Sequence, residues 1–274
     1  MKGTRADLRL VELGLAESRE KARSLIMSGA VSIGGVRVEK PGDNVPPDCG
    51  LSVKENPIPF VSRGGLKLDK PVHKYALSLA NAVALDIGAS TGGFTDCMLQ
   101  NGAKKVYAID VGYGQLDWRL RNDPRVIVME RTNARYMEPG WFPEQPDFAS
   151  MDVSFISIRL ILPQIFTCLR AGANAVVLVK PQFEAGRGKV GKNGVVRDPE
   201  THRDVLLRAA EFALETGFCV LQVDYSPITG PKGNIEFLLV LRKPGRGESA
   251  DTALALRETV EKIVSEAHDV HKNV

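Results

Sequence analysis

The chain has 274 residues, of which 43% are hydrophobic and 25% charged, a composition typical of a globular protein with one large or two smaller domains. The formal net charge is only +3, so a surface for nucleic acid has to come from local basic patches. The four cysteines are widely spread and show no metal-binding spacing, which predicts free thiols in a reducing compartment and no metal site. The N-terminus has no apolar signal segment and no apolar run reaches about 18 residues, so we expect a cytoplasmic protein without a membrane span.

Residues 1–55 are predicted to form a small α+β domain. Two short helices, Asp7–Gly14 and Arg19–Ser28, precede a hairpin that turns at Gly34-Gly35, and a last strand follows at Leu51–Val53. The elements and their order resemble the ribosomal-protein-S-four-like RNA-binding domain over residues 4–53, through the segments 13–26 and 29–35 and the pair Lys40-Pro41. That resemblance implies that this domain binds RNA.

Basic residues of this domain are candidates for RNA contacts. Arg19 and Arg23 lie about 40° apart on their predicted helix, so both guanidinium groups can meet one phosphate backbone. The alternative is an ordinary solvated helix face, because nearby glutamates almost balance the charge. The further RNA-binding candidates along the chain are Arg5, Arg37, Lys40, Arg63, Lys189 and Lys192.

Residues 56–61 are predicted to be a linker, made short and stiff by Pro57 and Pro59. The segment Ser62–Leu68 is expected to open a helix that runs toward Leu79. Pro71 falls inside it and is expected either to kink the helix or to restart it.

The second predicted domain, residues 62–248, is organised around Ala82–Phe94. The apolar run Val83–Ile87 has the pattern of a buried parallel strand, and a turn with the pattern Gly88-x-x-x-Gly92-Gly93 follows it. A helix is expected over Gly93–Gln100. A strand, a glycine turn and a helix in this order form the first half of a nucleotide-binding βαβ unit.

The spacing of the glycines and two acids indicate which ligand this turn holds. The loop lacks the G-x-G-x-x-G pattern of a dinucleotide site, and Asp86 before it suits a cationic ligand better than a phosphate. The next strand, Lys105–Ile109, ends at Asp110, where such folds usually hold a ribose diol. A nucleoside with a positive charge indicates S-adenosylmethionine, the alternative being a turn that serves only strand–helix packing. The other candidate cofactor residues are Gly88, Ser90, Gly92, Gly93, Phe94 and Asn133.

Strand and helix patterns continue to alternate after this unit. Strands are expected at 126–129, 148–152 and 175–179, helices at 158–169 and 199–216, and two β-rich runs at 218–224 and 235–241. This order predicts an α/β fold with a Rossmann-like seven-stranded methyltransferase sheet, helices on both faces and the last strand antiparallel. Residues 249–274 are predicted to form a charged C-terminal helix, to which we assign no role.

Polar residues at strand ends mark the expected site, because ligands of open α/β sheets bind beyond the carboxyl ends of the strands. Asn133 is a candidate for the adenine edge, the alternative being a turn-forming asparagine. The glycine-rich and basic loop 185–197 is predicted to be a mobile flap, or else an ordinary solvent loop.

Four residues can supply the chemistry of methyl transfer to a hydroxyl, which is a poor nucleophile at neutral pH. Lys180 at the end of a buried strand can assist the hydroxyl, with Asp152 positioning its amine. Lys67 can favour the deprotonated form of the Lys180 amine or stabilise the developing alkoxide. Glu236 can orient Lys67 or the hydroxyl. Taken singly, each also has a structural explanation: a solvent-facing lysine or glutamate, or a helix N-cap for Asp152.

The motifs around these residues resemble the Lys-Asp-Lys-Glu tetrad of ribose 2′-O-methyltransferases of the FtsJ/RrmJ type. They are Ser62-Arg-Gly-Gly-Leu-Lys67, Asp86-Ile-Gly-Ala-Ser-Thr-Gly-Gly-Phe94, Met151-Asp152-Val-Ser-Phe, Val179-Lys180-Pro-Gln-Phe-Glu184 and Gly233-Asn-Ile-Glu236-Phe. In this order behind an RNA-binding module, over about residues 4–243, they resemble the TlyA (hemolysin A) family.

This resemblance implies an S-adenosylmethionine-dependent methyltransferase that acts on a cytidine 2′-hydroxyl of ribosomal RNA, in the 16S or 23S molecule or in both. Its partners would be ribosomal RNA or ribosomal subunits, and the oligomeric state is left open. Two other classes of protein are alternatives. A non-catalytic RNA-binding or ribosome-assembly factor conflicts with the complete tetrad. A hemolysin-like membrane-active protein conflicts with the missing span, signal peptide and cationic amphipathic stripe.

Overall fold

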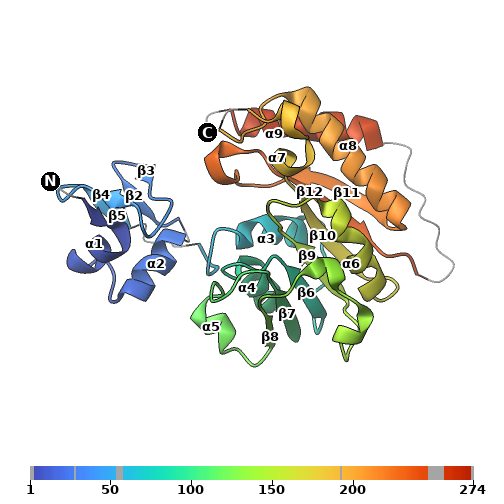
Figure 1. Ribbon diagram of the computed structural model, residues 1–274, viewed down its shortest axis with the longest axis horizontal. Helices are drawn as coiled ribbons and strands as arrows, with labels where there is room; N and C mark the ends of the chain where they lie inside the picture. The colour runs from blue at the N-terminus through green and yellow to red at the C-terminus, as the bar shows by residue number, and fades with distance from the viewer. Residues whose placement is uncertain (1–2, 28, 54–57, 192, 246–255, 273–274) are drawn as a thin grey trace.

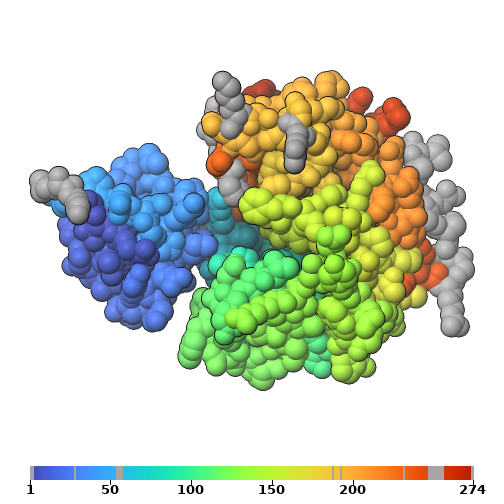
Figure 2. Space-filling view, viewed as in Figure 1, coloured from blue at the N-terminus to red at the C-terminus, as the bar shows by residue number. Residues whose placement is uncertain are grey.

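The computed structural model describes residues 3–27, 29–53, 58–191, 193–245 and 256–272 (Figure 1). A small N-terminal domain lies beside a larger α/β domain, and Figure 2 shows the two in contact over a narrow area. The expected linker positions Asn56 and Pro57 lie outside the described residues.

The N-terminal domain packs two helices against short β-strands. Its elements are β1 (Thr4–Arg5), α1 (Ala6–Glu12), α2 (Arg19–Met27), β2 (Val31–Ile33), β3 (Val36–Arg37), β4 (Asn44–Val45) and β5 (Leu51–Val53). Both Gly34 and Gly35 have positive φ, which confirms the predicted tight turn between β2 and β3. A compact core around Leu10, Ile26 and Val31 holds the helices and strands together.

A seven-stranded sheet forms the centre of the larger domain, in the order β11-β12-β10-β9-β6-β7-β8. Its strands are β6 (Val83–Ile87), β7 (Lys105–Ile109), β8 (Val126–Met129), β9 (Phe148–Met151), β10 (Asn174–Val179), β11 (Cys219–Tyr225) and β12 (Phe237–Arg242). Neighbouring strands from β10 to β8 run parallel, and β12 runs antiparallel to both β10 and β11. The predicted α/β sheet with its last strand antiparallel is therefore confirmed.

Helices cover both faces of this sheet, as predicted (Figure 1). They are α3 (Gly65–Lys74), α4 (Gly93–Gln100), α5 (Trp118–Arg121), α6 (Leu162–Cys168), α7 (Pro181–Glu184), α8 (Pro199–Thr216) and α9 (Leu256–Val270). Leu85 of β6 packs in the core that includes α6, α8 and α9, whereas its neighbour Ala84 packs in the core with α3, α4 and α5. This split follows from the alternation of side chains along a strand.

Two predicted helices differ from the structure. The first, expected to run toward Leu79, continues through Pro71 and ends at Lys74, because Ala76 takes a left-handed backbone conformation (φ 50°) that stops it. The second, expected over Ile158–Leu169, is a 3₁₀ turn at Ile158–Leu160 followed by α6. Pro163 lies in the first turn of α6, and its missing N–H cannot continue a helix from the preceding turn.

A buried carboxylate anchors α3 to the sheet. Asp224 of β11 is fully buried and accepts hydrogen bonds from Lys70 Nζ (2.8 Å), Lys74 Nζ (3.0 Å) and the Tyr75 hydroxyl (2.8 Å). Burial on its own would raise the pKa of Asp224, but these donors hold it below its ordinary value. Since Lys70 and Lys74 are one turn apart, the carboxylate clamps the C-terminal half of α3.

We expect Asp224→Ala to lower the free energy of unfolding of the larger domain by about 2–4 kcal/mol, because it leaves Lys74 and the Tyr75 hydroxyl without this acceptor and Lys70 with only the Tyr225 carbonyl. Urea unfolding followed by circular dichroism measures this change. Glu211→Ala, at an exposed position of α8, is the matched control and should change stability by less than about 0.5 kcal/mol. Equal effects of the two substitutions would contradict the anchoring role.

Candidate active site

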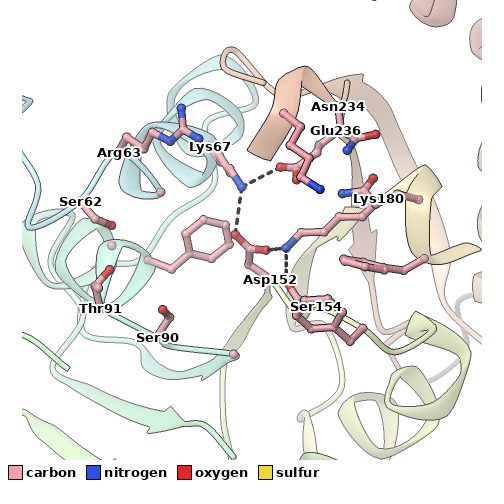
Figure 3. Close-up of a pocket in the computed structure, with 18 of the residues that line it drawn as sticks. Ser62, Arg63, Lys67, Ser90, Thr91, Asp152, Ser154, Lys180, Asn234 and Glu236 are labelled. Atoms are coloured by element: carbon pink, nitrogen blue, oxygen red, sulfur yellow. Dashed lines mark hydrogen bonds and ion pairs between the residues drawn. The ribbon is translucent and has the colours of Figure 1, made fainter. Parts of the chain in front are cut away.

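A cavity of about 530 Å³ lies where strand ends of the sheet meet the start of α3. It is lined on one side by the glycine turn after β6 and on the other by residues that follow β9 and β10 or precede β12. Figure 3 shows Ser62, Ser90 and Thr91 on one side of this space and Lys180, Asn234 and Glu236 on the other.

Asp152 joins the two candidate lysines in this cavity. Its Oδ2 lies 3.2 Å from Lys67 Nζ, and its Oδ1 forms an ion pair with Lys180 Nζ. Lys67 Nζ also lies 2.7 Å from Glu236 Oε2, and Lys180 Nζ donates to Ser154 Oγ at 3.0 Å. The structure thus brings together the four residues that the sequence analysis grouped, with the lysines on opposite oxygens of one carboxylate (Figure 3).

The register of the sheet explains this convergence. Val179 of β10 pairs with Phe237 of the antiparallel strand β12, so Lys180 and Glu236, one residue further along, leave the sheet at the same edge. Asp152 follows the parallel strand β9 at that edge. Lys67 comes from the first turn of α3 and completes the group from a helix rather than from a strand end.

Burial and opposite charges act against each other on Lys67 and Asp152. Burial on its own would lower the pKa of Lys67, but Asp152 and Glu236 raise it above its ordinary value. Burial would likewise raise the pKa of Asp152, but Lys67 and Lys180 hold it below its ordinary value. Lys67 is therefore a fixed ammonium and Asp152 a fixed carboxylate within the cavity.

The glycine turn serves both the cavity and the packing around it. Gly88 has φ 83°, and a Cβ there would lie 2.4 Å from the backbone oxygen of Asp152, so only glycine lets the turn approach the centre of the site. Ser90, Gly93 and Phe94 line the cavity with Gly88. Gly92 is not among the residues that line the cavity. A Cβ there would lie 2.3 Å from Leu120 of α5, so packing against α5 requires glycine at this position, and a contact of Gly92 with the cofactor stays a prediction.

Asp86 requires a correction. Its carboxylate is fully buried beneath α4, where Oδ2 accepts a hydrogen bond of 2.6 Å from Thr95 Oγ1 and Oδ1 lies 3.5 Å from Ser150 Oγ. Burial raises its pKa to about 7. The expectation that Asp86 faces a cationic ligand is wrong, because the side chain points into the layer between sheet and helix.

The other two candidate cofactor residues have different outcomes. Asp110, at the end of β7, accepts hydrogen bonds from the backbone N–H groups of Ser90 (2.8 Å) and Gly112 (2.7 Å) and lines a narrow cleft next to the main cavity. Asn133 instead caps the 3₁₀ turn Ala134–Tyr136 by accepting from the Arg135 N–H at 3.1 Å, and it lines neither space. This contact is that of the turn-forming asparagine of the alternative, and the adenine-edge assignment stays a prediction.

The basic candidates in the N-terminal domain are partly engaged. Arg5 and Arg19 both bind the buried carboxylate of Asp7, at 2.9 and 3.0 Å, and with burial opposing them they lower its pKa to about 2. Helix spacing alone did not indicate that Arg19 would be engaged by Asp7, and the joint contact of Arg19 and Arg23 with RNA stays a prediction. Arg23 and Lys40 are exposed and form no ion pair among the described residues.

The remaining basic candidates lie in or near the larger domain. Lys189 forms a 3.0 Å ion pair with Asp204 of α8, and Lys192 lies outside the described residues. The expected flap is tied to the cavity, since Asn234 Oδ1 accepts from the Val196 N–H (3.1 Å) and its Nδ2 donates to the Gly194 carbonyl (3.0 Å). Arg37 and Arg63 lie together at the boundary between the domains.

Sequence reasoning missed an aromatic pair at the cavity. Phe155 is 90% exposed, lines the cavity and has φ 66°, an unusual conformation for a bulky residue. Its ring lies 5.1 Å from that of Phe183, which also lines the cavity. Phe155 lies in the motif that follows Asp152 and Phe183 in the motif that follows Lys180, but no local pattern indicates which phenylalanine is exposed.

Comparison with known proteins follows the same division of the chain. A family model for FtsJ-like methyltransferases matches residues 60–243, and a model for the S4 domain matches residues 4–48. YqxC of Bacillus subtilis is 53% identical over 272 residues, which is 99% of this chain and 96% of that protein. The protein of Mycobacterium tuberculosis named 16S/23S rRNA (cytidine-2′-O)-methyltransferase TlyA is 44% identical, over 96% of this chain and 97% of its own.

A solved structure from Streptococcus thermophilus that carries a hemolysin name has 47% identity, a TM-score of 0.77, and coverage of 99% of this chain and 98% of that one. The fold and the site therefore define a methyltransferase, and the chain belongs to the FtsJ-like methyltransferase family. Within that family its relatives over nearly the full length place it with the TlyA (hemolysin A) proteins. Among the described residues, no helix has both the length and the apolar character needed to cross a bilayer.

The buried Asp86 makes stability depend on pH in a predictable direction. Its pKa is about 7 in the folded protein against an ordinary value of 3.8, so its neutral form stabilises the fold fully below pH 3.8, and this contribution is lost as pH rises to about 7. We expect Asp86→Asn, which keeps the shape without the charge, to be more stable than the parent protein above pH 7 by about 2–4 kcal/mol. Urea unfolding between pH 4 and pH 8 measures this, with Glu215→Gln as an exposed control; parallel curves for Asp86→Asn and the parent would contradict it.

Proposed function

We propose that this protein transfers a methyl group from S-adenosylmethionine to the 2′-hydroxyl of a cytidine in 16S or 23S ribosomal RNA, or in both. The observation that carries the proposal is the Asp152 carboxylate that holds Lys67 and Lys180 together in the cavity, with Glu236 on Lys67. The substrate follows from the S4 domain and from the relative named TlyA. We place the reaction in the cytoplasm, with ribosomal RNA or ribosomal subunits as partners.

The residues of the cavity fit S-adenosylmethionine. The cavity volume of about 530 Å³ suits a nucleoside-sized ligand. Ala89 and Ser90 line both the main cavity and the cleft that contains Asp110, so one ligand can contact the glycine turn and the carboxylate at the same time. When bound, S-adenosylmethionine supplies an electrophilic methyl group on a sulfonium. Gly88, Ser90, Gly93, Phe94 and Asp110 are the residues that would hold it.

The tetrad would manage the proton and the charge of the acceptor hydroxyl. Lys180, whose amine is held by Asp152 and Ser154, takes the hydroxyl proton. The ammonium of Lys67 places positive charge beside the oxygen as it becomes an alkoxide. Glu236 and Asp152 keep Lys67 in position from two sides.

Phe155 and Phe183 would hold the base of the target nucleotide. An exposed ring at the cavity offers a flat apolar surface, and RNA-binding proteins commonly stack unpaired bases on such rings. Arg63 and Lys232 also line the cavity and provide positive charge for the adjoining phosphates.

We expect Lys180→Ala to lower the rate of methyl transfer by about 10²–10⁴-fold, because it removes the group that takes the proton. Transfer of a labelled methyl group to ribosomal RNA, with mass-spectrometric mapping of the nucleosides, measures it. Lys262→Ala on the exposed face of α9 is the matched control and should keep full activity. RNA binding should persist in both variants. Unchanged transfer by Lys180→Ala would refute the catalytic role, and a parent protein that binds RNA without methylating it would favour the assembly-factor alternative.

We expect Phe155→Ala to reduce kcat/KM for RNA by about 10- to 100-fold, since stacking of one base contributes about 1–3 kcal/mol. Phe155→Trp keeps an aromatic face and should recover most of the loss. Steady-state kinetics at saturating S-adenosylmethionine measure kcat/KM for RNA for both variants. A Trp variant as weak as the Ala variant would contradict the stacking role.

A further inference from the structure

Two arginines from different domains meet at the domain boundary. Arg37 ends β3 in the N-terminal domain, and Arg63 precedes α3 in the larger domain and lines the catalytic cavity. The Arg63 backbone N–H donates to the Met27 carbonyl at 3.4 Å, and the Arg37 guanidinium packs against Gly29, where a Cβ would lie 2.7 Å from its Cζ. The end of α2 therefore supports both arginines.

The two guanidinium groups share one acid. Glu39 Oε1 lies 3.8 Å from Arg37 Nε, and Glu39 Oε2 lies 3.9 Å from Arg63 Nη2. Both distances are longer than a hydrogen bond, so the carboxylate attracts the arginines without satisfying their N–H groups. Its side chain is 56% exposed and is free to turn toward solvent.

The two arginines retain positive charge and hydrogen-bond donors that Glu39 does not satisfy. Two positive groups against one carboxylate leave an excess of one positive charge at the boundary. Arg37 Nε is buried and has no hydrogen-bond partner among the described residues. Burial lowers the pKa of Arg37, the neighbouring Arg63 lowers it further, and Glu39 opposes both effects. An anion that reached hydrogen-bonding distance would satisfy both guanidinium groups.

We propose that Arg37 and Arg63 form a site for one backbone phosphate of the bound RNA, and that the Glu39 carboxylate occupies this site while no RNA is bound. The inference rests on the proposed function, which makes RNA the substrate. A phosphate has the charge and the paired oxygens that guanidinium groups bind bidentately. One phosphate bound by both arginines would bridge the two domains and fix the N-terminal domain relative to the cavity. Arg63 lies only four residues before Lys67 in the chain.

Removal of the Glu39 charge distinguishes this role from a structural cross-link. If Glu39 competes with RNA, Glu39→Gln tightens binding; if it joins the domains, the same change weakens it. Glu20→Gln is the matched control, because Glu20 is exposed on α2, forms no ion pair among the described residues and changes the net charge equally. The probe is fluorescently labelled 16S or 23S ribosomal RNA transcript, and anisotropy with the full-length protein gives Kd over a range of salt concentrations.

We expect Glu39→Gln to lower Kd by about three- to tenfold beyond the effect of Glu20→Gln. Arg37→Ala and Arg63→Ala should each raise Kd and reduce the slope of log Kd against log salt by about one. In an Arg37→Ala/Arg63→Ala background the gain from Glu39→Gln should vanish, because the contested site is gone.

A Kd for Glu39→Gln equal to or weaker than that of Glu20→Gln would overturn the proposal, and so would a full gain in the background without the arginines. If the arginine variants do not fold, the comparison of the two glutamine variants still decides. Binding needs neither S-adenosylmethionine nor turnover. Failure of methyl transfer with an intact Glu39→Gln effect would therefore contradict the proposed function and leave the phosphate site supported.

Discussion

The site depends on one carboxylate that binds two lysines. In a cavity that is largely removed from water, Asp152 holds Lys67 on one oxygen and Lys180 on the other. Burying the charges of Lys67 and Asp152 is favourable only when the geometry is tight and further partners are present. Glu236 and Ser154 are those partners, and the strand register at one sheet edge delivers them.

Helix α3 connects this carboxylate to the rest of the molecule. Its first turn carries Lys67, and its last turns are clamped by Asp224 from the far edge strand β11. Arg63, just before the helix, lies at the boundary with the N-terminal domain. The segment from Arg63 through α3 therefore contacts the N-terminal domain, the cavity and the edge strand of the sheet.

The glycines of the turn after β6 serve two different purposes, space beside the cavity and helix packing. Gly88 admits the backbone beside Asp152, whereas Gly92 makes room for Leu120 of α5. The acids near the turn divide in the same way. Asp110 reaches the cleft and binds the backbone of the turn, but Asp86 is buried and bound to Thr95. Proximity to a glycine turn in the sequence therefore does not show that a side chain faces the site.

The sequence by itself determined the order of strands and helices, the glycine turn, the boundaries of most elements and the identity of the four residues at the centre of the site. These follow from local periodicity, from turn chemistry and from motifs whose order resembles a family. Only the tertiary structure decided the direction and partners of side chains. It turned Asp86 inward, used Asn133 as a cap, gave Arg19 to Asp7, exposed Phe155 and brought Arg37 and Arg63 to one carboxylate. The reason is that these outcomes depend on contacts between segments far apart in the chain, and local patterns carry no information about which segment will lie opposite.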